Sequence, residues 1–131
     1  MKRHDYLRSA RDVHDHLTRI GEEVLEDGGR LVVSSVAGEL TVEWPERGAA
    51  VYFTLATGVR PAPLQLPQLA AINSELVVTG FRLVEGQVVF RTHAYLDGER
   101  ALSSLVLERS IQACRATVSN YRDELEALAH E

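Results

Sequence analysis

A chain of 131 residues is long enough for one domain with its own core, and 45% hydrophobic and 25% charged residues are ordinary globular values. The net charge of −5 argues against a nucleic-acid-binding surface, and no apolar run is long enough to span a membrane. A single cysteine excludes an intramolecular disulfide, and the charged N-terminus lacks a signal-peptide core. We therefore expect one cytoplasmic domain over residues 1–131.

Residues 4–27 have apolar side chains at steps of three and four, which predicts an amphipathic helix. Its stripe consists of Tyr6, Ala10, Val13, Leu17, Ile20 and Val24. We expect Gly28 and Gly29 to end the helix, because a glycine just past a helix can take the left-handed conformation. Gly21 would then lie inside the helix, where it either lets another backbone approach closely or is merely tolerated.

The period changes to two after this helix. Strands are predicted over residues 31–36, 40–44 and 49–57, with short turns between them. Such short loops between consecutive strands indicate an antiparallel meander.

Residues 58–66 form a connector, because Pro61 and Pro63 suit neither a strand ladder nor a helix. A short second helix is predicted over residues 67–78, although Val77 and Val78 could instead open the next strand. A fourth strand begins at Phe81, and residues 87–95 form a fifth after a tight turn.

Residues 102–129 contain no glycine or proline and are predicted to form one long helix, capped by Ser103 or Ser104. Its apolar stripe consists of Leu107, Ile111, Cys114, Val118, Tyr121, Leu125 and Leu128. At ~1.5 Å per residue the helix is roughly 40 Å long and should cross the whole molecule. Its opposite face, with Arg109, Arg115 and Arg122, is expected to be solvent-exposed.

The order helix, three strands, helix, two strands, helix predicts an α+β fold with a twisted antiparallel sheet. The first and last helices should cover one face of this sheet. We expect the covered face to consist of Leu40, Val42, Trp44, Val51, Phe53, Leu55, Phe81, Leu83, Val88 and Phe90.

The sequence contains no motif for catalysis, cofactor binding or metal binding. Cys114 lies in the apolar stripe and is expected to be structural. His14 and His16 are two residues apart, which is not a metal-binding spacing on a helix, and the histidines are expected at the surface. We therefore expect a protein that is not an enzyme and uses no cofactor.

The second face of the sheet should carry few charges, which favours a partner site. We predict that it binds protein through Tyr52, Thr54, Val89 and Tyr95. The short helix over 67–78 is also rather apolar, and it either meets a partner or closes the open end of the sheet. A second copy is expected to meet this helix or the end of the last one, through Leu69, Ile72, Leu76, Tyr121, Leu125 and Leu128.

Residues 69–95, LAAINSELVVTGFRLVEGQVVFRTHAY, resemble a pattern of the YbjN family. The pattern is Ile72-Asn73 at the end of a helix, a strand from Gly80-Phe81, the turn Glu85-Gly86, and a strand with valine and Arg91. The element order resembles this family and type III secretion chaperones over nearly the whole chain. The chain departs from the family in its proline-rich loop and its histidine-bearing first helix.

The resemblance implies a sensory or stress-related regulator with no known catalytic residues. The related secretion chaperones are small acidic homodimers that bind extended segments of client proteins.

Three functions follow as hypotheses. The first is a non-catalytic homodimer, chaperone- or adaptor-like, that binds a client protein through the open sheet face or a hairpin edge. The second is a regulatory domain that binds a small ligand between sheet and helices, near Trp44. The third is an enzyme whose site is split across a dimer interface and uses Arg91, His93 and glutamate residues.

Overall fold

The computed structural model describes residues 5–76 and 80–130. The elements are, in chain order, β1 (Tyr6–Leu7), α1 (Ala10–Arg19), β2 (Val24–Asp27), β3 (Arg30–Val33), β4 (Leu40–Glu43), β5 (Ala50–Ala56), η1 (Pro63–Gln65), α2 (Leu66–Asn73), β6 (Gly80–Val84), β7 (Gln87–Tyr95), β8 (Leu102–Ser103), α3 (Ser104–Asn120) and α4 (Arg122–Ala127). None of the helices in these two ranges is long and apolar enough to cross a membrane.

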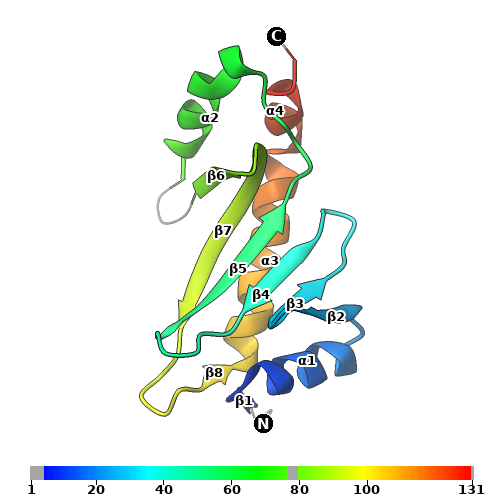
Figure 1. Cartoon of the computed structure of the whole chain (residues 1–131), viewed down its shortest axis with the longest axis vertical. Helices are drawn as coiled ribbons and strands as arrows, with labels where there is room; N and C mark the ends of the chain where they lie inside the picture. The colour runs from blue at the N-terminus through cyan, green and yellow to red at the C-terminus, as the bar shows by residue number, and fades with distance from the viewer. Residues whose placement is uncertain (1–4, 77–79, 131) are drawn as a thin grey trace.

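The main sheet has six antiparallel strands in the order β2-β3-β4-β5-β7-β6, and β1 pairs with β8 in a separate two-stranded ladder (Figure 1). The predicted α+β fold and the antiparallel meander are confirmed. Val77 and Val78, whose assignment to helix or strand was left open, lie outside the described residues.

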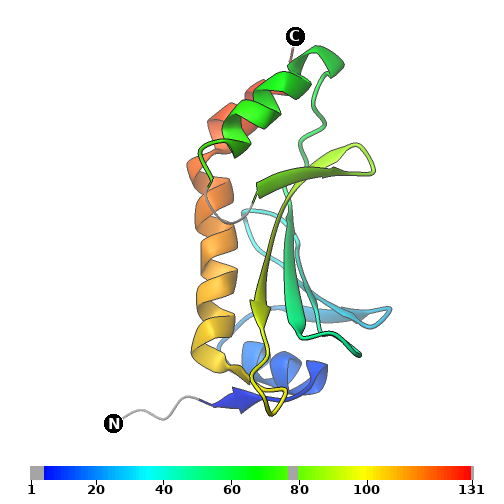
Figure 2. The ribbon, with the colours of Figure 1, turned by 90° about the vertical axis from the view of Figure 1, so that its left-hand side faces the viewer.

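One face of the sheet is covered by helices. Figure 2 shows α3 running along one side of the sheet, with α4 and α2 continuing beyond it. α1 packs against β2 and β3 at the other end. The large buried side chains that the main sheet turns towards these helices are Leu31, Val33, Leu40, Val42, Val51, Phe53, Leu55, Phe81, Val88 and Phe90. Two predicted members of this face are less buried: Trp44 is half-buried, and Leu83 is 43% exposed on the edge strand β6.

The first helix is much shorter than predicted. α1 ends at Arg19 with Ile20 as its C-cap, and the next residue, Gly21, has a φ of +97°. The Gly21 N–H donates to Thr18 O and the Glu22 N–H donates to Leu17 O, which is the hydrogen-bond pattern of a Schellman C-cap. The predicted position of Gly21 inside a helix was therefore wrong, because its backbone terminates the helix.

Residues 24–27 form strand β2 rather than the end of a helix. Gly28 and Gly29 have φ values of +58° and +85° and connect β2 to β3 as a two-residue hairpin. The prediction that these glycines cap a helix was wrong, since a glycine pair with positive φ also suits a tight hairpin turn.

The last helix is divided at Tyr121, whose φ of −106° interrupts the helical path between α3 and α4. Arg122 stabilises this break, because its guanidinium donates to Thr57 O at 3.0 Å and to Ala37 O at 2.8 Å. The prediction of one continuous helix was wrong here, but its stripe is buried as expected. Leu107, Ile111, Cys114, Val118, Leu125 and Leu128 are all at most 4% exposed. The predicted cap at Ser103 is confirmed, since its Oγ accepts from the Leu105 N–H.

The helix–helix contacts use side chains that the sequence placed in solvent. His16 is only 6% exposed, and its Nε2 lies 3.1 Å from Glu108 Oε2 on α3. Arg115 is half-buried and pairs with Glu22. The prediction of a surface histidine at position 16 was wrong, because α1 turns this residue towards α3.

Candidate functional site

The face of the sheet opposite α3 carries a row of side chains that crosses all six strands. Directly paired residues of an antiparallel ladder lie on the same face. The ladder pairs Leu25 with Val32, Val32 with Thr41, Thr41 with Thr54, Thr54 with Arg91, and Arg91 with Gly80. In the part of the chain that the structure describes, no helix covers this row (Figure 2). We call it the open face.

The four residues predicted to bind protein all lie on the open face. Tyr52 and Tyr95 are 38% and 69% exposed, and Thr54 is half-buried between its ladder neighbours Thr41 and Arg91. Val89 is only 4% exposed, between its ladder neighbours Ala56 and Arg82. The two tyrosines therefore supply most of the surface that these four residues offer.

Aromatic and basic side chains gather around Tyr52. The Arg91 guanidinium carbon lies 4.3 Å from the centre of the Tyr52 ring, which is a cation–π contact. His93 lies 5.9 Å from Tyr52 and 4.9 Å from Tyr95 between ring centres. Arg91 and His93 therefore pack against tyrosine rings on the open face.

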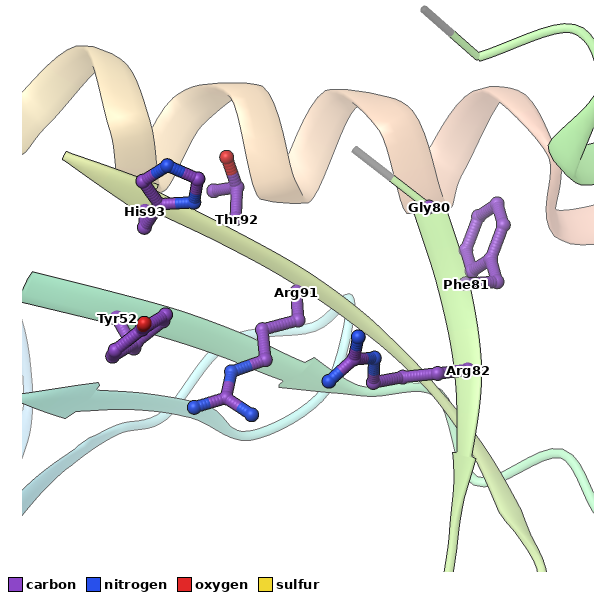
Figure 3. A pocket seen from close by; sticks show the side chains of 7 residues that line it. All are labelled: Tyr52, Gly80, Phe81, Arg82, Arg91, Thr92 and His93. Atoms are coloured by element: carbon purple, nitrogen blue, oxygen red, sulfur yellow. The ribbon is translucent and has the colours of Figure 1, made fainter. Parts of the chain in front are cut away.

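Arg82 extends this cluster onto β6. Figure 3 shows the side chains of Arg82 and Arg91 reaching into the same hollow beside the Tyr52 ring. The hollow has a volume of about 450 Å³ and is lined by Tyr52, Gly80, Phe81, Arg82, Arg91, Thr92 and His93. We call Tyr52, Arg82, Arg91 and His93 the arginine–aromatic cluster.

The charge of this cluster is not balanced by a neighbouring carboxylate. Among residues 5–76 and 80–130, neither Arg82 nor Arg91 forms an ion pair. Glu43 does lie on the open face, but it is the ladder neighbour of Tyr52 on the β4 side. The arrangement can attract a negatively charged group, and Tyr and Arg are the residue types that dominate binding surfaces.

As candidate functional residues, the sequence predicted Arg91 and His93 for a split active site, and it did not indicate Arg82. The predicted turn at Glu85-Gly86 would have been enough to place Arg82. A two-residue hairpin turn fixes the register, so it places Arg82 on the same face as Arg91, one diagonal step away.

The other residues considered as candidate functional residues lie outside this cluster. Cys114 is fully buried under the sheet, as predicted, and burial raises the pKa of its thiol to about 12. Within the described ranges, no group of three or more His, Cys, Asp and Glu could hold a metal ion. Half-buried Trp44 packs against the core, and a small-ligand cavity beside it stays a prediction.

Half of the residues predicted to form a dimer interface are buried inside the chain. Leu69, Leu125 and Leu128 are 8%, 0% and 2% exposed and belong to the core. Ile72, Leu76 and Tyr121 are half-buried, so a second copy could reach only these three. Self-association stays a prediction.

No protein-family model matches this chain, and a search of curated proteins found no significant sequence match. Among solved structures, the fold is similar to the crystal structure of YbjN, a proposed transcription regulator from E. coli. The TM-score is 0.63, and the similarity covers 92% of this chain and 96% of that chain at 10% sequence identity. An identity this low concerns the fold alone. The chain therefore has a YbjN-like fold, as the pattern over residues 69–95 predicted.

Proposed function

We propose that this chain is a non-catalytic binding module that captures a segment of another protein on the open face of its sheet. The observation that carries the proposal is the difference between the two faces of the sheet. Helices α1 and α3 cover one face, whereas the other presents the arginine–aromatic cluster and Tyr95. A regulatory role for such a module agrees with the role proposed for YbjN.

The chemistry of the cluster supports a protein partner with a negatively charged surface. Tyrosine and arginine supply large contact areas and several hydrogen bonds, and both are enriched where protein partners bind most tightly. Arg82 and Arg91 form no ion pair among the described residues, so their positive charges can complement acidic side chains of a partner.

The test is a capture experiment with a matched control. Tagged protein is incubated with lysate of its host, and the bound proteins are identified by mass spectrometry. We expect one dominant partner, which is lost when Tyr52 and Tyr95 are both replaced by Glu, because two carboxylates then repel the acidic segment. Tyr6→Glu is the control, because Tyr6 is 60% exposed but lies on β1, outside the main sheet.

Circular dichroism melts of the variants must coincide with that of the unmodified protein, so that loss of capture reports on the surface. Capture that survives the double substitution, or that Tyr6→Glu abolishes equally, contradicts the open face as the binding surface.

A further inference from the structure

We propose that Arg82 and Arg91 form a subsite that binds the carboxylate of a glutamate or aspartate in the captured segment. This inference rests on the proposed function and specifies the chemistry of its partner. It assigns the hollow in Figure 3 as the place where the segment is anchored.

The ladder register places Arg82 and Arg91 near each other on the open face. Gly80 pairs with Arg91 and Arg82 pairs with Val89, so the two arginines stand on neighbouring strands, on the same face. Both line the hollow of about 450 Å³. Two positive charges that line one hollow repel one another, and an anion between them offsets that repulsion.

The Arg91 side chain is preorganised for binding an anion. The ring of Tyr52 lies against its guanidinium group, so the side chain loses little freedom when an anion binds. Its Nε atom is buried and has no hydrogen-bond partner among the described residues. A guanidinium group binds a carboxylate well because its N–H donors form a planar fork.

Other arginines of the chain contrast with this pair. Arg115 bonds the Glu22 carboxylate, and Arg122 bonds two backbone carbonyls. Arg100 donates to Gly48 O and Pro45 O. Those side chains stabilise the fold, whereas Arg82 and Arg91 carry charge that no acidic side chain of the described chain neutralises.

The position of Glu43 indicates over which strands an acidic segment would bind. This carboxylate lies on the β4 side of Tyr52, whereas Arg82 lies on β6 at the opposite side of β7. An acidic segment is therefore repelled over β4 and attracted over the β6–β7 hairpin. The shared chemistry is an oxyanion, and we assign it to a carboxylate because the proposed occupant is a protein segment.

The experiment titrates three probes into the ¹⁵N-labelled protein: a blocked peptide of alternating glutamate and valine, its glutamine counterpart, and inorganic phosphate. The reporters are the amides of Gly80, Thr92 and His93 and the Nε–H of Arg91. We expect the glutamate peptide to shift these signals and the glutamine peptide to bind at least roughly tenfold more weakly, since a charge-assisted hydrogen bond is lost.

Arg82→Gln should weaken binding of the glutamate peptide roughly tenfold without affecting the fold, because Arg82 is exposed. Arg91→Lys keeps the charge but removes the fork, and it should weaken binding by a smaller factor. Arg109→Gln is the matched control, because Arg109 is exposed on α3, on the covered side of the sheet. This variant should bind the glutamate peptide as tightly as the unmodified protein does.

Equal binding of the two peptides, or binding that ignores Arg82→Gln, overturns the subsite. A second outcome overturns the assignment to a carboxylate: inorganic phosphate shifts the Arg91 signal, and the glutamate peptide leaves it unchanged. The two failures are distinguishable. Capture that is lost in the tyrosine double variant but kept in Arg82→Gln retains the open face as the binding surface and removes the subsite. Capture that survives the tyrosine double variant removes both, because Arg82 and Arg91 lie on the same face as the two tyrosines.

Discussion

Arg115 on α3 holds Glu22 in an ion pair with two hydrogen bonds, from Nη1 to Oε1 at 2.8 Å and from Nη2 to Oε2 at 3.0 Å. The two side chains are 27% and 24% exposed. Glu22 directly follows Gly21, the glycine that ends α1. The ion pair therefore attaches the turn between α1 and β2 to α3, the helix that covers the sheet.

This pair should make stability depend on pH. The hydrogen bonds from Arg115 lower the pKa of the Glu22 carboxyl below its ordinary value of 4.5. A carboxyl whose pKa is lower in the folded state stabilises the fold above its unfolded pKa and loses this contribution as the pH falls through the folded pKa. The free energy of unfolding should therefore fall below pH 4.5 more steeply in the unmodified protein than in Glu22→Gln.

At neutral pH we expect Glu22→Gln to lower the free energy of unfolding by about 1 kcal/mol, measured by urea denaturation. Glu99→Gln is the matched control. Its pair with Arg8 is longer, at 3.4 Å, and its side chains are 56% and 77% exposed, so its effect should be undetectable. Equal pH dependence for the two variants contradicts the role given to Glu22.

Gly38 should not tolerate a side chain. Its φ is +133°, and a Cβ atom there would press against the carbonyl oxygen of Ala56. Gly38→Ala combines a strained backbone with a steric clash, so we expect a loss of about 2 kcal/mol or more in urea denaturation. Gly48→Ala is the control, because a Cβ at Gly48 meets no atom within 4 Å, and its effect should stay within about 0.5 kcal/mol. Similar losses for both variants would contradict this account.

Asn73 should stabilise the edge of the sheet. Its side chain donates to Phe81 O at 2.8 Å and accepts from the Phe81 N–H at 2.7 Å, so it serves both backbone groups of one β6 residue. Asn73→Ala leaves these partly buried groups without a partner, and we expect a loss of about 2 kcal/mol in thermal or urea unfolding. Ser74→Ala is the control, since Ser74 is exposed and bonds only within the end of α2. The amide of Phe81 should also exchange its hydrogen faster in Asn73→Ala, and unchanged exchange would count against the contact.

The same asparagine shows what the sequence could and could not predict. Asn73 belongs to the stretch that resembles the YbjN pattern, and that resemblance placed it at the end of a helix, where α2 does end. The residue pattern alone predicted a longer helix, over 67–78. Its contact with Phe81 depends on how α2 docks onto β6, which no local pattern contains. In the last helix, by contrast, the spacing alone predicted the buried stripe, because a period near 3.6 survives the break at Tyr121.

The N-terminal error has a physical cause. Val24 continues the spacing of Leu17 and Ile20, so the helical pattern extends through a segment that forms β2. The glycine pair after it suits a helix cap or a hairpin turn equally, and only pairing with β3 decides between them. Alternation within strands placed Tyr52, Thr54 and Tyr95 on one face, but the contact between Arg91 and Tyr52 follows from packing between strands.

Cys114 should react with thiol reagents only when the protein unfolds. It is fully buried, and burial raises the pKa of its thiol to about 12, so almost no thiolate forms near neutral pH. The rate of labelling by a disulfide reagent should be negligible in native buffer. In urea it should rise along the unfolding curve followed by circular dichroism. Rapid labelling without urea would show that α3 separates from the sheet in the native state.

Self-association is the last prediction, and the structure narrows the surface that it can use. The chain mass is 14.5 kDa, and we expect light scattering at high micromolar concentration to give twice this value. Of the predicted contact residues, only Ile72, Leu76 and Tyr121 retain exposed surface, beside a hollow between α2 and α4. Ile72→Glu should therefore convert the dimer to a monomer, whereas Leu64→Glu should not, although Leu64 is 76% exposed on the neighbouring turn. A monomeric mass for the unmodified protein would refute the homodimer, and a dimer that ignores Ile72→Glu would move its interface to another surface.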